Sequence, residues 1–133
     1  MGRYIEHQVF TAQSDAACRA FMLRTQVFKQ PVCAVVLIPE KGIHVSVYGG
    51  EASHIGAVSI IAPDGSRNDL QFPGHKDGQI AVRWADALHD AGFSPVTAEA
   101  GIHYDALSKE GISEVMSAAD DLLTFLLQIV SRS

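Results

Sequence analysis

The sequence predicts an α+β fold, a two-layer α/β sandwich in which a mixed, mainly antiparallel sheet carries two helices on one face. Several strand-like segments precede the first helical pattern, which is followed by one more strand and a second helix. Helices and strands therefore do not alternate as they do in doubly wound folds. At 133 residues the chain is long enough for one proper core, and we expect residues 1–133 to form a single domain.

Six segments have the apolar periodicity of strands. They run from Arg3 to Phe10, Arg19 to Lys29, Cys33 to Ile38, Ile43 to Tyr48, Ile55 to Ile61 and Pro95 to His103. The second is ambiguous, and Thr25, Val27 and Phe28 favour a strand. A turn region from Thr11 to Ala17 precedes it, and Pro39 to Gly42 predicts a tight hairpin. Ile55 to Ile61, apolar at nearly every position, predicts a central strand covered on both faces.

Two helices follow the strand-rich part of the chain. The first begins at Lys76 or Asp77 and continues to about Ala91, where Gly92 closes it. Before it, the dozen residues from Pro63 to Gly74 read as a long loop, which favours a lid or binding loop. The second helix follows Ser108, a candidate N-cap. Its apolar stripe is too wide for one sheet to cover, so we expect a homodimer.

Composition excludes several classes of protein. The net charge of −5, with scattered Lys and Arg, argues against nucleic-acid binding. No targeting segment is visible, and no apolar run approaches the roughly 20 residues that span a bilayer. Cys18 and Cys33 lack metal-binding spacing and suit a reducing compartment. We therefore expect a cytoplasmic protein without a membrane partner.

Histidines near glycines recur at the ends of predicted elements. His54 precedes Gly56 by two residues, Gly101 precedes His103 by two, and Gly74 is followed directly by His75. A bare glycine beside an imidazole leaves a floor that a flat ligand or another backbone can approach closely. We expect valine at Gly56 or Gly101 to block a ring while preserving the fold.

Metal binding is one chemistry that these side chains offer. Imidazoles with a carboxylate suit a divalent metal, and His54, His75 and His103 could converge with Glu51 or Glu99. The spacing alone is weak, and histidines that merely stabilise turns are the alternative. Fingerprints of catalytic triads, phosphate loops and dinucleotide sites are absent.

Phosphate binding is a second option. Lys76 and free amides at the start of the first helix suit an anion, with Arg67 on the long loop in support. Both cations are at least as well explained as solvated surface charges.

Three stretches together resemble the prenylated flavin chaperone family, the small D subunits that accompany UbiD-type gallate and vanillate decarboxylases. They are Gly-Gly-x-x-x-His-Ile-Gly-Ala (Gly49 to Ala57), Pro-Gly-His-Lys-Asp (Pro73 to Asp77) and Ala-Gly-Ile-His-Tyr-Asp (Ala100 to Asp105). The resemblance covers roughly Val35 to Leu127, and residues 1–30 add nothing to it.

The resemblance implies a non-catalytic accessory role. It implies a protein that binds prenylated FMN, or FMN, and helps to load or mature a UbiD-type decarboxylase whose cofactor a UbiX-type prenyltransferase makes. The matching positions are His54, Gly56, Gly74, His75, Lys76, Gly101, His103 and Asp105. A small His-site metalloenzyme, either a hydrolase or an isomerase, and a purely structural decarboxylase subunit are the alternatives.

Overall fold

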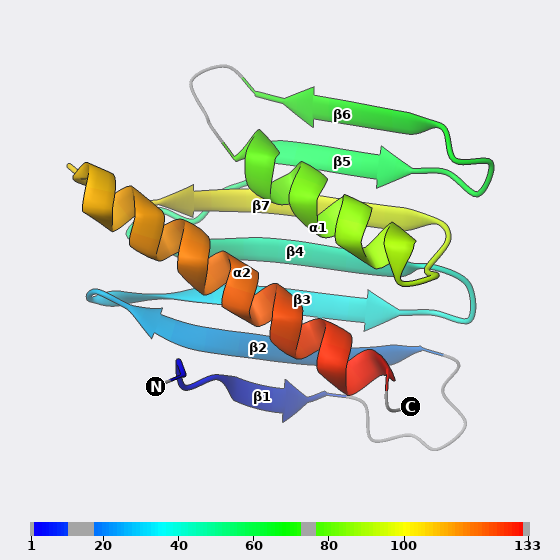
Figure 1. The fold of residues 1–133 in the computed structure, drawn as a ribbon, viewed down its shortest axis with the longest axis horizontal. Coiled ribbons are helices and arrows are strands. Elements are labelled where there is room, and N and C mark those ends of the chain that lie inside the picture. The colour runs from blue at the N-terminus through cyan, green and yellow to red at the C-terminus, as the bar shows by residue number, and fades with distance from the viewer. Residues whose placement is uncertain (1, 11–17, 73–76, 132–133) are drawn as a thin grey trace.

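The computed structural model describes residues 2–10, 18–72 and 77–131, which form one sheet and two helices (Figure 1). The strands are β1 (Glu6–Val9), β2 (Arg19–Val27), β3 (Gln30–Ile38), β4 (Ile43–Gly50), β5 (Ala57–Ile61), β6 (Arg67–Gln71) and β7 (Val96–His103). The helices are α1 (Gly78–Asp90) and α2 (Lys109–Ser131). The predicted turn at Thr11 to Ala17 lies outside the described residues.

The seven strands form one sheet in the order β1-β2-β3-β4-β7-β5-β6. Strands β1 to β4 are joined as successive antiparallel neighbours. Strand β7 is parallel to β4 and antiparallel to β5, which also pairs with β6. The sheet is therefore mixed and mainly antiparallel, and the predicted α+β class is confirmed.

Both helices lie on the same face of the sheet (Figure 1). Helix α1 packs on β5 and β7, whereas α2 runs diagonally across β2 and β3. Their buried stripes meet the inward side chains of the strands, and Trp84, Leu88, Leu122 and Leu126 are fully buried. The core is this single layer between helices and sheet. No helix in the described part of the chain is long and apolar enough to cross a membrane.

Local signals at the helix ends were predicted correctly. Asp77 is the N-cap residue of α1, and Gly92 follows the helix with a φ of 103°, which suits a glycine. At α2 the hydroxyl of Ser108 accepts a hydrogen bond of 3.0 Å from the backbone N–H of Gly111.

Two strand predictions were wrong. Strand β5 is the second strand from one edge of the sheet, and its outward side chain Ile60 is 37% exposed, so helices cover only one of its faces. The expected long loop from Pro63 to Gly74 contains β6, which forms that edge. All five residues of β6 are exposed, so the strand lacks the apolar alternation that would have revealed it.

Most of the apolar stripe of α2 is covered within one chain, so the stripe alone does not require a second chain. The sheet and α1 bury its central residues, including Val115, Leu123 and Leu126. Near the C-terminus Phe125 is half-buried, and its ring meets His7 with 5.9 Å between centroids. Ile112, at the start of the helix, remains 52% exposed.

Candidate functional site

A cavity of about 290 Å³ lies where the end of β7 meets the first turns of both helices. Its polar lining comes from His54, Asp77 and His103. Its apolar lining is supplied by Ile80, Ile102, Tyr104, Leu107, Ile112, Val115 and Met116. The cavity thus brings His54 and His103 together, as the sequence predicted, and adds a carboxylate and an apolar wall.

Asp77 fixes the geometry on one side of this cavity. Its side chain is only 7% exposed, and its two oxygens have different partners. Oδ1 accepts a hydrogen bond from the backbone N–H of Ile102 at 3.1 Å, and Oδ2 lies 3.1 Å from Nε2 of His54. One carboxylate therefore connects the start of α1, the end of β7 and the segment before β5.

The imidazole of His54 lies between two acceptor oxygens. Its Nδ1 is 2.9 Å from the carbonyl oxygen of Ala52, and its Nε2 faces Asp77. These two contacts fix the orientation of the ring from both sides.

The two strand-end glycines allow protein atoms to approach closely. A Cβ on Gly56 would lie 2.1 Å from Oδ2 of Asp77, and a Cβ on Gly101 would lie 1.5 Å from the carbonyl oxygen of His54. Of the two expected neighbours of Gly101, a flat ligand or another backbone segment, the structure shows a backbone segment. Valine at Gly101 would meet the backbone, which contradicts the expectation that this variant keeps the fold intact, whereas valine at Gly56 would displace the side chain of Asp77.

His103 belongs to a second group of polar side chains. Its Nε2 lies 2.8 Å from Oδ1 of Asp105, and its carbonyl accepts a 2.7 Å hydrogen bond from the N–H of Glu51. A hydrogen bond from the Glu51 carboxyl and another from His103 lower the pKa of Asp105. His103 is half-exposed at the rim of the cavity, where a ligand can reach it.

The described residues do not assemble a metal centre. No group of three His, Cys, Asp or Glu side chains among them is placed to hold an ion. His54 and His103 are paired with separate carboxylates. Glu99, a suggested ligand, is instead 3.8 Å from Nε2 of His44. His75, the third proposed ligand, lies outside the described residues, as do Gly74 and Lys76.

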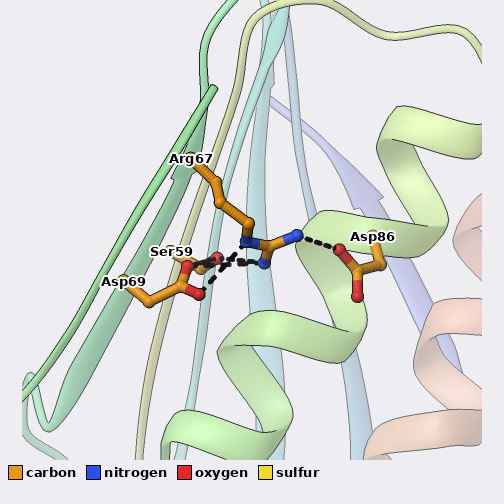
Figure 2. Close-up of polar contacts among 4 residues, drawn as sticks. All are labelled: Ser59, Arg67, Asp69 and Asp86. Atoms are coloured by element: carbon orange, nitrogen blue, oxygen red, sulfur yellow. Dashed lines mark hydrogen bonds and ion pairs between the residues drawn. The ribbon is translucent and has the colours of Figure 1, made fainter. Parts of the chain in front are cut away.

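The suggested phosphate contacts are directed elsewhere. The N–H of Gly78, the first residue of α1, donates to Oε1 of Gln71 at 3.0 Å. Figure 2 shows Arg67 reaching from β6 to Asp86 of α1, with Asp69 and Ser59 beside it. Arg67 therefore ties the edge strand to α1 and does not assist at the cavity.

A larger cavity, of about 790 Å³, lies between β6 and α1. Three carboxylates line it, from Asp69, Asp86 and Asp90, together with the guanidinium of Arg83. Arg83 is itself paired with Asp120 of α2. This excess of carboxylates opposes the binding of a phosphate, so the larger cavity suits a flavin nucleotide less well than the smaller one.

Sequence reasoning missed most of the cavity lining. Asp77 was seen only as the start of a helix, and nothing in its spacing links it to Ile102, 25 positions away. The apolar residues from α2 read simply as core-facing positions. The one available signal was an aspartate at a helix N-cap, and in the structure its side chain caps no backbone N–H of its own helix.

Comparison with known proteins identifies the family. A solved structure titled "Crystal Structure of a Novel Chaperone Complex for Yeast 20S Proteasome Assembly" aligns with a TM-score of 0.54 and 11% identity, covering 83% of this chain and 95% of that one. That likeness shows a shared fold. No curated protein matches the chain. The family model for the prenylated flavin chaperone LpdD-like domain matches residues 28–131. The chain therefore belongs to the prenylated flavin chaperone LpdD-like domain family.

Proposed function

We propose that this chain binds prenylated FMN at the cavity between β7, α1 and α2, and that it assists the loading or maturation of a UbiD-type decarboxylase without catalysing the reaction. The observation that carries the proposal is the cavity itself. An apolar wall from three elements faces two imidazoles that carboxylates hold in place, within the region that the family model matches.

The described residues fit the ring system of the cofactor better than its phosphate. A cavity of about 290 Å³ accommodates part of a tricyclic ring, whose faces suit Ile80, Ile102 and Met116. The buried carboxylate of Asp77 would repel a phosphate beside it. The phosphate therefore belongs at the polar end of the ligand, away from Asp77, and it requires a cation such as Lys76.

The remaining proposed contacts follow from this orientation. Gly74, His75 and Lys76 immediately precede Asp77 in the sequence, and we assign them to the polar end of the ligand. Asp105 orients His103 by its 2.8 Å contact. Gly56 and Gly101 contribute through the close approach that they allow rather than as stacking surfaces.

A divalent metal shared by His54, His75 and His103 is the second candidate. It is favoured by the one observation that His54 and His103 line the same cavity. Elemental analysis of wild type and His54→Ala tests it, because a shared ion would be stoichiometric in the first and absent from the second. Equal metal content in the two proteins would contradict it.

The cellular setting is part of the same proposal. The prenylated cofactor would come from a UbiX-type prenyltransferase, and we place the exchange in the cytoplasm. Both cysteines, Cys18 and Cys33, are free thiols, which supports a reducing compartment.

Anaerobic calorimetric titration with prenylated FMN tests the cavity directly. His103→Ala should weaken binding about fivefold, because one hydrogen bond contributes about 1 kcal/mol net. His103 is half-exposed, so its removal leaves the fold intact. His44→Ala is the matched control, since His44 is 41% exposed on the opposite face of the sheet and should bind like wild type.

Co-expression provides the functional readout. A UbiD-type decarboxylase produced beside His103→Ala should contain less cofactor and show less activity than one produced beside His44→Ala. Equal affinity of the two variants for prenylated FMN would place the binding site elsewhere on the molecule.

A further inference from the structure

The face of the sheet opposite the helices carries apolar side chains on both sides of a polar centre. The strand register aligns Met22 of β2, Val35 of β3, Ser46 of β4, Glu99 of β7, Val58 of β5 and Leu70 of β6. Leu37 and Ile60 lie in the next row, on either side of His44 and Thr97. We call this surface the bare face.

The bare face is exposed where the other face is buried. Leu37 is 40% exposed, Ile60 37% and Leu70 55%, whereas the alternate residues of β3 and β5 on the helix side are buried. Both helices pack on the other side (Figure 1). Several large apolar side chains exposed on one face of a sheet mark an interaction site.

Polar groups at the centre of the bare face pair within the same chain. Nδ1 of His44 lies 2.5 Å from the hydroxyl of Thr97, and Nε2 lies 3.8 Å from the carboxylate of Glu99. A two-fold contact brings identical residues together, so unpaired charges near its centre would repel. Glu99 lies beside the His44 ring and its side chain is only 23% exposed, which limits that repulsion.

The dimensions of the bare face match those of a stable dimer. Seven strands of four to nine residues, about 4.8 Å apart and rising about 3.3 Å per residue, give a face on the order of 750 Å². Specific complexes bury about 800 Å² of accessible surface per partner, so a stable dimer would use nearly the whole bare face. A partner must be equally broad and flat to cover the apolar side chains on both sides of the polar centre, and the bare face of a second copy has that shape.

We propose that a second copy of this chain packs on the bare face, so that two sheets stack with their helices outward. Two sheets packed in this way lie about 10 Å apart with their strands roughly aligned. The contact would bury Val35, Leu37, Val58, Ile60 and Leu70 from each copy. It places the homodimer interface on the sheet and leaves the cavity at the helix ends open.

Light scattering of the full chain without cofactor tests this proposal, so its outcome is independent of flavin binding. Wild type should have a mass near twice 14.3 kDa at micromolar concentration. Leu37→Glu places a carboxylate inside the contact and should raise the dimer dissociation constant at least about 100-fold. Circular dichroism should match wild type, because Leu37 is partly exposed within one chain.

Ile112→Glu is the matched control, since Ile112 is an exposed apolar residue on α2 and its replacement should leave the dimer intact. Ile60→Glu replaces Leu37→Glu as the test if the latter fails to fold. A wild-type monomer would overturn the proposal, including the case in which the bare face binds the decarboxylase instead. A dimer that survives both sheet substitutions, or one broken only by Ile112→Glu, would overturn it as well.

Discussion

Replacement of Gly56 and Asp77, separately and together, tests whether the Asp77 carboxylate can occupy its position only because Gly56 has no side chain. A Cβ on Gly56 would lie 2.1 Å from Oδ2 of Asp77, so Gly56→Ala must displace that carboxylate. The displaced group loses its contacts with Ile102 and His54, both at 3.1 Å. Asp77→Ala removes the same two interactions by deletion.

The expected magnitudes follow from these two contacts. Hydrogen bonds to a charged group contribute about 1.5 to 3 kcal/mol each, so the loss of two should cost each single variant at least about 3 kcal/mol of unfolding free energy. In the double variant the carboxylate is lost only once, and the new Cβ occupies the space that it leaves. The double variant should therefore also lose about 3 kcal/mol, which gives a coupling free energy of about 3 kcal/mol.

Equilibrium unfolding in urea measures the free energy of unfolding of wild type, the two single variants and the double variant. Gly42→Ala combined with Asp77→Ala is the control, because a Cβ on Gly42 would meet Pro95 at the opposite end of β4. That pair should be additive. If the losses of unfolding free energy of Gly56→Ala and Asp77→Ala add to within about 0.5 kcal/mol in the double variant, the position of Asp77 does not depend on the missing side chain of Gly56.

Two further predictions concern titration. The Ser59 hydroxyl and then Arg67 lower the pKa of Asp69, so these contacts stabilise the fold at neutral pH and stop doing so as acid protonates the carboxylate. Ser59→Ala should therefore raise the pKa of Asp69 in an NMR titration. An unchanged pKa would contradict the contacts in Figure 2. Burial raises the pKa of Tyr104 from 10.0 to about 12, so the folded state should lose stability as the pH rises between these values. Tyr104→Phe should lose that alkaline dependence, at the cost of the 2.7 Å hydrogen bond to Gln30, and a slope like that of wild type would contradict it.

The fold was predictable wherever periodicity and end signals agreed. Strand β7 alternates cleanly from Val96 to His103, α1 ends just before Gly92, and α2 begins directly after Ser108. Strand β6 was missed because edge strands tolerate exposed polar residues, and Asn68-Asp69 is also typical of a loop. The apolar run of β5 was taken to be covered on both faces because periodicity cannot say what covers a face.

The candidate site was predictable in its residue types but not in its connections. The recurrence of glycine near histidine identified His54 and His103, which do line one cavity. Asp105, the partner of His103, lies only two residues along the chain, whereas the pairing of His54 with Asp77 depends on how β7 meets the start of α1. That arrangement follows from the strand order, which no local pattern encodes.

The placement of β7 between β4 and β5 also has a consequence for biosynthesis. The chain emerges from its N-terminus, so β4 and β5 are made before the strand that separates them. Until residues 96–103 have been added, each of these strands presents an unpaired edge next to the future core. Such edges can pair with other chains. A nascent or truncated chain that ends before Val96 therefore exposes two unpaired strand edges that can bind other chains. The pairing of β7 with β4 and β5 covers both edges at once.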